Sequence, residues 1–166
     1  LSPNRTPGQS IEDRLVQAIE ATSKIKNRSK RTIDISIFTL QSTKIVEALV
    51  TAHKADTAVR VLIDERQATD EHTQKTFGVY AQYLAFHGIA VKTIAGPDPI
   101  GGYQLAQQNH HKVSLFAGEL VETGSANYTV YAAIGNFENG HFINAKEDVK
   151  GYAFIFEHMW KEAKDL

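Results

Sequence analysis

The chain has 166 residues, 42% apolar and 22% charged, which is ordinary for a globular protein, and no run approaches the ~20 apolar residues of a membrane span. It contains no cysteine, which excludes disulfides, thiolate nucleophiles, iron–sulfur clusters and cysteine-bound zinc. Eighteen Lys and Arg residues against 19 Asp and Glu residues give a net charge of −1, so only local positive charge can attract a polyanion.

Helical and strand patterns alternate through the first half of the chain. Residues 1–9 hold two prolines and a glycine and are expected to form a flexible leader. Ser10 followed by Asp13 resembles a capping box, which opens the first helix. Apolar spacing then predicts helices over 10–25, 43–55 and about 77–87, and strands over 32–40, 58–64 and 89–95.

The second half changes character after a Gly/Pro-rich loop over 96–102. Two apolar strands, about 110–116 and 119–124, meet at Ala117-Gly118 as a hairpin, and an aromatic stripe over 149–163 predicts a closing helix. We therefore expect residues 10–166 to form one α/β domain. Its mixed, largely parallel sheet is flanked by helices on both faces.

Polar, reactive side chains are concentrated between Asn109 and Glu138. Side chains alternate along a strand, so His110 and Lys112 share a face while His111 points away. Ser125 and Asn127 share a face if the backbone there stays extended. One imidazole, one ammonium, one hydroxyl and one carboxamide are thus predicted to surround a single anion.

The complete pattern reads His110-x-Lys112, Gly124-Ser125-x-Asn127 and then Glu138. It resembles the phospholipase D superfamily, in particular its small bacterial endonucleases, which carry one copy of the motif. The first half shares the likeness, with Ser36-x-Phe38-Thr39 and the run over 61–66 in matching order. The resemblance covers nearly the whole chain and implies an α/β/α sandwich with phosphodiesterase activity.

The family pattern continues from the lysine through four residues to an aspartate, and here that position is Ala117. Because the aspartate is not expected to touch the phosphorus, we expect its loss to weaken support of the site, an effect of ~10 to 100-fold. The alternative is an inactive, phosphate-binding protein.

Hydrolysis of a phosphodiester adds negative charge to the nonbridging oxygens, so the site needs positive charge, a nucleophile and a proton donor. We expect Lys112 to supply the charge, with Ser125 and Asn127 as neutral donors. Neutral His110 then attacks phosphorus and forms a phosphohistidine. Glu138, reaching the other ring nitrogen, is expected to fix the tautomer of His110.

The family uses a second motif copy to protonate the leaving oxygen, and this chain has one copy. The resemblance therefore implies a homodimer in which His110 meets its symmetry mate. In this scheme Lys112 of each subunit replaces the usual divalent cation, so neither a metal nor another cofactor is needed.

Three other interpretations of the same residues are weaker. His111 is a rival for the catalytic ring, although strand alternation turns it away from Lys112. A metal site formed by His110, His111 and Glu138 is disfavoured because adjacent strand residues diverge. Ser125 as a hydrolase nucleophile is disfavoured because Thr123 occupies the first glycine position of Gly-x-Ser-x-Gly.

Two segments outside the motif are candidates for substrate contacts. A basic segment is expected either to bind the phosphate backbone or to be a solvated face; it contains Lys24, Lys26, Arg28, Lys30 and Arg31. Tyr103 and residues 104–108 are expected to line the site entrance or simply to connect two elements.

We conclude that the sequence predicts a metal-independent endonuclease for DNA, with RNA as an open further substrate. A lipid phosphodiesterase is the rival enzyme, disfavoured because we find no amphipathic helix with a basic face and exposed aromatic residues. The resemblance to often exported nucleases favours the periplasm or the exterior.

Overall fold

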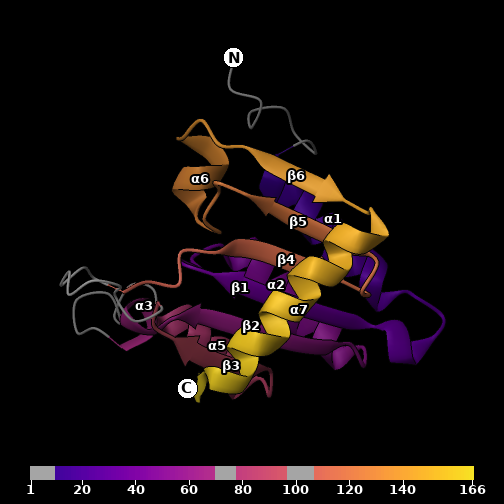
Figure 1. The fold of residues 1–166 in the computed structure, drawn as a ribbon, viewed down its shortest axis with the longest axis horizontal. Helices are drawn as coiled ribbons and strands as arrows, with labels where there is room; N and C mark the ends of the chain where they lie inside the picture. Colours follow the sequence, from indigo (N-terminus) through magenta and orange to yellow (C-terminus); the bar gives the residue numbers. More distant parts are fainter. Residues whose placement is uncertain (1–9, 70–77, 97–106) are drawn as a thin grey trace.

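A seven-stranded sheet forms the centre of the computed structural model, which describes residues 10–69, 78–96 and 107–166 (Figure 1). The predicted leader and Tyr103 lie outside the described residues. Across the sheet the strand order is β6-β5-β4-β1-β2-β3-β7. The strands are β1 (Thr32–Ile37), β2 (Ala58–Asp64), β3 (Ala90–Ile94), β4 (Lys112–Phe116), β5 (Leu120–Gly124), β6 (Gly140–Ile143) and β7 (Lys164–Asp165).

The sheet is mixed, as predicted, but parallel pairing is less extensive than expected. Only β1–β2 and β2–β3 are parallel among the described strand pairs, whereas β1–β4, β4–β5, β5–β6 and β3–β7 are antiparallel. The β4–β5 hairpin was predicted, but β6 and β7 were not. Both additions are short, four and two residues, and neither shows the apolar alternation that marks a half-buried strand.

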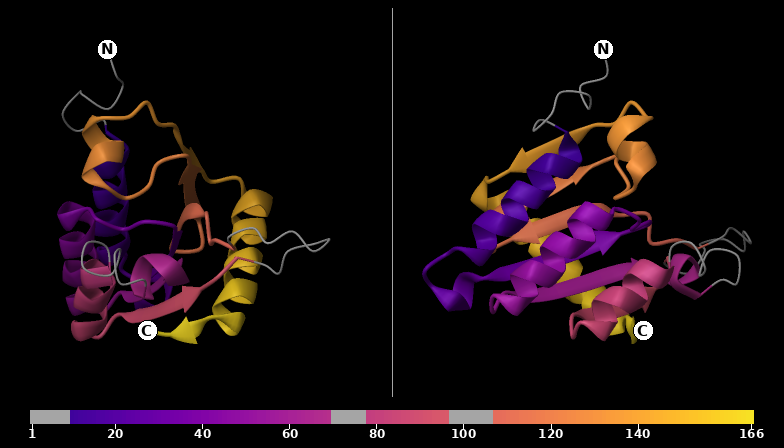
Figure 2. Two further views of the ribbon diagram at one scale, coloured as in Figure 1. Left: turned by 90° about the vertical axis from the view of Figure 1, so that its left-hand side faces the viewer. Right: turned by 180° about the vertical axis from the view of Figure 1, so that it is seen from behind.

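Helices cover both faces of the sheet, as predicted (Figure 2). Helices α1 (Ile11–Ser23), α2 (Thr43–Lys54) and α5 (Val79–Phe86) pack on one face, and α7 (Lys146–Glu162) crosses the other. The short elements are η2 (Arg28–Lys30), α3 (Glu65–Thr69) and α6 (Val130–Ile134). The predicted cap of α1 is confirmed, since the hydroxyl of Ser10 accepts a hydrogen bond from the Asp13 amide at 3.0 Å.

Strand alternation divides the interior into two cores. Ile33, Ile35 and Ile37 of β1 face the core under α1, α2 and α5, whereas Val113 and Leu115 of β4 face α7. Each such fully buried side chain contributes roughly 1.5–3 kcal/mol to folding. No helix in the described ranges is long and apolar enough to cross a membrane.

Arg60 of β2 ties α7 to the sheet. Its guanidinium donates to Asp34 at 2.6 Å and to Glu157 of α7 at 2.5 Å. It also lies over the rings of Phe156 and Trp160, at 4.9 and 5.3 Å from their centroids. The Arg60 pKa is raised because its hydrogen bond to Asp34 stabilises the cation. Helix α7 is thereby fixed across the strands that lead to the site.

Candidate active site

The predicted catalytic residues lie at one end of the strands β4 and β5, near α6 at the left of Figure 1. Lys112 is the first residue of β4 and pairs with Ile37 at the end of β1. On the other side of β4, Val113 pairs with Thr123, one residue before Gly124 ends β5. The antiparallel hairpin therefore places His110 and Lys112 beside the segment that carries Ser125 and Asn127.

Lys112 and His110 form the first part of the site. The Lys112 side chain is buried, with 6% of the residue exposed, and its Nζ donates to the His110 carbonyl oxygen at 2.9 Å. Burial lowers the pKa of Lys112, and the negative charge of Glu138 opposes that shift. The ammonium is thus held in a protein-enclosed position, where it acts on a nearby anion more strongly than in water.

Phe38 supports both groups, and the sequence analysis did not assign it to the site. Its ring centroid lies 5.0 Å from the His110 ring and 5.2 Å from the Lys112 Nζ. The Phe38 amide also donates to the His111 carbonyl at 2.9 Å, which extends the β1–β4 pairing beyond the strands. The His110 residue itself is exposed. Phe38 therefore limits the position of the ring while leaving it accessible to substrate.

Ser125 and Glu138 form the second part of the site. The Ser125 hydroxyl donates to one Glu138 oxygen at 2.5 Å, and the Asn136 amide group donates to the other at 3.1 Å. Ser125 is also bound on both sides by Asn139, whose side chain accepts from the Ser125 amide and whose amide donates to the Ser125 hydroxyl. The segment between α6 and β6 thus positions Glu138 over the end of β5.

Glu138 was expected to reach the ring of His110, and the structure gives it other partners. Within the described residues its carboxylate accepts from Ser125 and Asn136, and no hydrogen bond joins it to His110. Its effect on Lys112 is electrostatic. These contacts tie Glu138 to Ser125 and place its charge near the ammonium of Lys112, and its predicted role at the ring of His110 stays a prediction.

A buried hydrogen-bond chain lies beneath Asn127. The hydroxyl of the neighbouring Tyr128 donates to Glu122 at 2.7 Å and is 2.5 Å from the Ser114 hydroxyl. All three residues are buried, and Tyr128 is also bound through its backbone to Thr39 and Gln41. The chain links β4, which carries Lys112, to the segment that carries Asn127. The sequence signal for it was the presence of Ser114 and Glu122 within otherwise apolar strands.

Asn109 fixes the residues before β4. Its amide donates to the Asp64 carboxylate at 2.8 Å, and its side chain is 3.3 Å from the Ser36 hydroxyl. The other Asp64 oxygen accepts from the amides of Arg66 and Gln67. Burial raises the Asp64 pKa against these bonds. Ser36 and Asp64 belong to the first-half segments of the sequence resemblance, and the structure explains them as supports for the strand entering the site.

Ala117 lies at the far end of β4 from Lys112. It has a φ of 56°, followed by Gly118 with a φ of 64°, in the turn between β4 and β5. It is five positions after Lys112, which is about 16 Å along an extended strand. Position 117 is therefore a turn position, and the effect of its residue on activity stays a prediction.

His111 lines a groove together with His110 and residues of α7. Its pKa is lowered by burial and, secondarily, by the charge of Lys112, and the predicted turn of its ring away from Lys112 stays a prediction. Among the described residues, no three His, Asp or Glu side chains are grouped as metal ligands.

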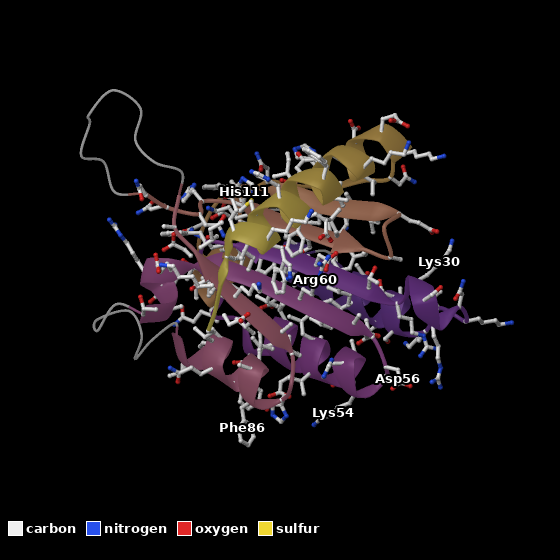
Figure 3. All side chains as sticks on the ribbon, turned by 60° about the horizontal axis from the view of Figure 1, so that its bottom comes forward. Lys30, Lys54, Asp56, Arg60, Phe86 and His111 are labelled. Atoms are coloured by element: carbon white, nitrogen blue, oxygen red, sulfur yellow. The ribbon has the colours of Figure 1, made fainter. Side chains whose placement is uncertain are left out.

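The predicted basic segment is not part of this cluster. Figure 3 shows Lys30 and Asp56 at the opposite end of the molecule from His111. The segment precedes β1, whose six residues span about 20 Å. Its described partners are internal: Lys24 pairs with Glu20, Arg28 with Asp56, Lys30 with Glu119, and Arg31 donates to two backbone carbonyls.

Comparisons with known proteins agree with this geometry. Residues 22–160 match the family described as "Cardiolipin synthase, PLD-like domain". The mitochondrial cardiolipin hydrolase of Xenopus laevis is 32% identical over 134 residues, which cover 81% of this chain. The human protein of the same name is 26% identical over 155 residues. The chain spans only 57% and 53% of the length of these two relatives.

Solved structures show the same fold. The crystal structure of Nuc from Salmonella typhimurium, described as a phospholipase D family member, matches with a TM-score of 0.71 and 26% identity. That match covers 91% of this chain and 89% of Nuc. NucT from Helicobacter pylori matches with a TM-score of 0.74 and 16% identity, over 95% and 96% of the two chains. The fold, the site geometry and the family match together establish that the chain belongs to the phospholipase D superfamily.

Proposed function

We propose that this chain is a metal-independent phosphodiesterase that acts as an endonuclease on DNA, with RNA as a further substrate. The observation that carries the proposal is that exposed His110 and the buried lysine Lys112 both contact Phe38, with the imidazole and the ammonium 5.0 and 5.2 Å from its ring centroid. A phosphodiester bound there meets a nucleophile and a fixed positive charge at once. Ser125 and Asn127 add neutral donors at the adjoining edge.

The reaction proceeds in two balanced steps. A ring nitrogen of His110 forms a bond to phosphorus, the ester P–O bond breaks, and the leaving oxygen takes a proton from a second imidazole. Water then attacks phosphorus, the P–N bond breaks, and the water proton returns to the second imidazole. Lys112 stabilises the charge on the nonbridging oxygens in both steps.

The second imidazole comes from a second copy of the chain. The chain carries one His-x-Lys motif, and exposure of His110 leaves its ring free to face a symmetry mate. Each protomer then contributes one histidine and one lysine to a shared phosphate. Mixing His110→Asn protomers with wild-type protomers tests this arrangement: a mixed dimer holds one imidazole and should be inactive, so activity should fall with the square of the wild-type fraction, whereas independent sites would give a linear fall.

The basic segment remains a proposed substrate contact outside the reacting cluster, and Tyr103, which is not among the described residues, remains a contact proposed from the sequence. The basic segment lies far from His110, so it can bind only a long substrate. Its surface ion pairs are each worth little, roughly 0–1 kcal/mol, and a phosphate backbone can replace their carboxylates. Its contribution is therefore to affinity for polymers and not to the chemical step.

A lipid phosphodiesterase is the second candidate, and one observation favours it. Four large apolar side chains beside Glu138 are exposed, including Tyr131 at 74% and Phe137 at 87%, with Val130 and Ile134 on the same short helix. This α6 patch gives the aromatic surface that the sequence analysis did not find. It is suited to a lipid interface, and the named relatives are cardiolipin hydrolases.

The discriminating experiment compares both substrates in the presence of a chelator. We expect plasmid nicking to persist in EDTA and cardiolipin vesicles to be cleaved much more slowly. His110→Asn serves as the inactive control for both assays. Loss of nicking in EDTA with recovery in magnesium would refute the metal-independent mechanism, and faster cleavage of cardiolipin would reverse the choice of substrate.

The α6 patch supplies a second discriminator. Tyr131→Ser together with Phe137→Ser should leave hydrolysis of a soluble phosphodiester unchanged, because neither side chain contacts the described site groups. If lipid is the substrate, the same variant should bind and cleave vesicles at least ten-fold less well. A matched control is Phe86→Ser, which removes an exposed aromatic ring from α5 on the far helix layer.

A further inference from the structure

A groove of about 520 Å³ opens next to His110 on the α7 side of the sheet. It is bounded by the end of β3, the residues leading into β4 and the C-terminal turns of α7. His110 and His111 both line it, so the groove is continuous with the predicted nucleophile. Its volume falls in the range of pockets that enclose small organic groups.

The charges of the groove do not suit a phosphate. Its one described lysine, Lys164, is bound to Glu65 at 2.9 Å, and a second carboxylate, Glu162, lies 3.5 Å from His158. With neutral imidazoles the ionised residues lining the groove carry two negative charges and one positive charge. The positive charge that attracts phosphate is on Lys112 instead, so the groove is complementary to an uncharged part of the substrate.

The groove combines an apolar wall with flat polar rings. Ile94, Ile155 and Met159 supply aliphatic surface, while His111 and His158 supply imidazoles. The lowered pKa of His111 keeps its ring neutral at neutral pH. A nucleobase fits such surroundings, because its faces pack on aliphatic and imidazole surfaces and its edges exchange hydrogen bonds. An acyl chain would displace water from the imidazoles and ion pairs of the groove without replacing its hydrogen bonds.

We propose that this groove, lined by His111, His158 and Met159, is a subsite for the nucleobase attached to one ester arm of the scissile phosphate. The inference rests on the proposed endonuclease function and specifies how that substrate is held. The subsite contributes affinity through stacking and shape, and it tolerates different bases because every base presents a π face.

The test measures steady-state hydrolysis of four phosphodiesters by the full chain and by the variant His158→Ala. His158 is 68% exposed, so its truncation leaves the core intact. The substrates are a dinucleotide, two versions of that dinucleotide with an abasic sugar on one or the other side of the phosphate, and bis(p-nitrophenyl) phosphate. Phe154→Ala is the matched control, because Phe154 is an exposed residue of α7 that does not line the groove.

We expect His158→Ala to raise KM for the dinucleotide about ten-fold with little change in kcat, the order expected for one stacked base. Removing the base from the side that occupies the groove should raise the KM of the wild type by the same factor. On that abasic substrate the wild type and His158→Ala should then have equal KM. Bis(p-nitrophenyl) phosphate and the Phe154→Ala control should show no change.

Three results would overturn the subsite. Equal loss on all substrates would indicate a general effect on the active site, and equal activity on all would show that the groove is unused. A greater loss on cardiolipin vesicles than on the dinucleotide would assign the groove to lipid. The proposed function fails separately if wild-type protein cleaves neither the dinucleotide nor bis(p-nitrophenyl) phosphate, and the subsite then fails with it.

Discussion

The hydroxyl of Tyr128 donates a 2.7 Å hydrogen bond to the carboxylate of Glu122, and both residues are at most 2% exposed. The pair lies directly beneath the backbone that carries Ser125 and Asn127, and Ser114 connects it to β4. The other Glu122 oxygen is buried without a hydrogen-bond partner in the described structure. A buried carboxylate with one donor is costly when it is ionised, so the protonation of Glu122 affects the stability of this part of the fold.

Glu122→Gln is predicted to remove a pH dependence of stability. Burial raises the pKa of Glu122 from 4.5 to about 7, against the bond from Tyr128 and the charge of Arg14. The folded state therefore binds the proton more tightly than the unfolded state. The free energy of unfolding should fall by about 3 kcal/mol as the pH rises from about 4.5 to above 7. Urea unfolding between pH 4.5 and 8 measures the change.

The glutamine variant is neutral at every pH and still accepts from Tyr128, so the difference between the two proteins isolates Glu122. The difference in free energy of unfolding between Glu122→Gln and the wild type should be largest above pH 7, where the variant is the more stable protein. Glu138→Gln provides a control at a less buried carboxylate. Parallel stability curves for wild type and Glu122→Gln would show that Glu122 does not titrate in this range.

Glu138→Gln is predicted to move the alkaline limit of activity to lower pH. Burial lowers the pKa of Lys112 below 10.5, and the charge of Glu138 partly offsets that effect. Since the charged lysine is the active form, kcat/KM should decline as the pH rises toward its lowered pKa. Removing the Glu138 charge lowers that pKa further. The measurement is kcat/KM for bis(p-nitrophenyl) phosphate between pH 7 and 10.5.

Lys112→Arg is the companion variant for this profile. A guanidinium remains charged throughout the range, so its residual activity should show no alkaline decline. If the alkaline decline of kcat/KM were unchanged in Glu138→Gln, or still present in Lys112→Arg, a group other than Lys112 would cause it.

Regular periodicity allowed most of the fold to be predicted. The cap at Ser10, the strand over 58–64 and the final helix followed from local patterns, and the structure confirms them. The largely parallel sheet was inferred from the alternation of helices and strands in the first half. The second half adds antiparallel strands, two of which are too short to produce a periodic signal.

The site was predictable where the motif specifies residue types and less so where tertiary packing decides. His110, Lys112 and Ser125 were selected from spacing and resemblance, whereas His111 was set aside by strand alternation although it lines the same groove as His110. The partners of Glu138 and the role of Phe38 depend on contacts between segments about 13 and 70 residues apart in sequence. The exposure of the apolar face of α6 also depends on the packing of distant segments, which a local sequence pattern cannot indicate.

Neutralising the basic segment is predicted to affect long substrates only. The variant Lys24→Ser, Lys26→Ser, Arg28→Ser should keep kcat/KM for a dinucleotide within about two-fold, because these residues lie about 20 Å from Lys112. With about 3.4 Å per base pair, a duplex must exceed about six base pairs to reach both places. A 30-base-pair duplex should bind more weakly and with a smaller salt dependence. Identical binding of that duplex by both proteins would show that the segment is a solvated face.

Ala117→Asp is predicted to change the hairpin and not the chemistry. Position 117 has a φ of 56°, a conformation in which glycine, asparagine and aspartate are more readily accommodated than alanine. The substitution should therefore raise the free energy of unfolding by up to about 1 kcal/mol, and Ala117→Gly should do so by a similar amount. Because the turn is at the far end of β4 from Lys112, kcat/KM should stay within about two-fold in both variants. A ten-fold rise in activity with Ala117→Asp but not with Ala117→Gly would instead show that the aspartate of the family pattern supports catalysis and that this chain has lost that support.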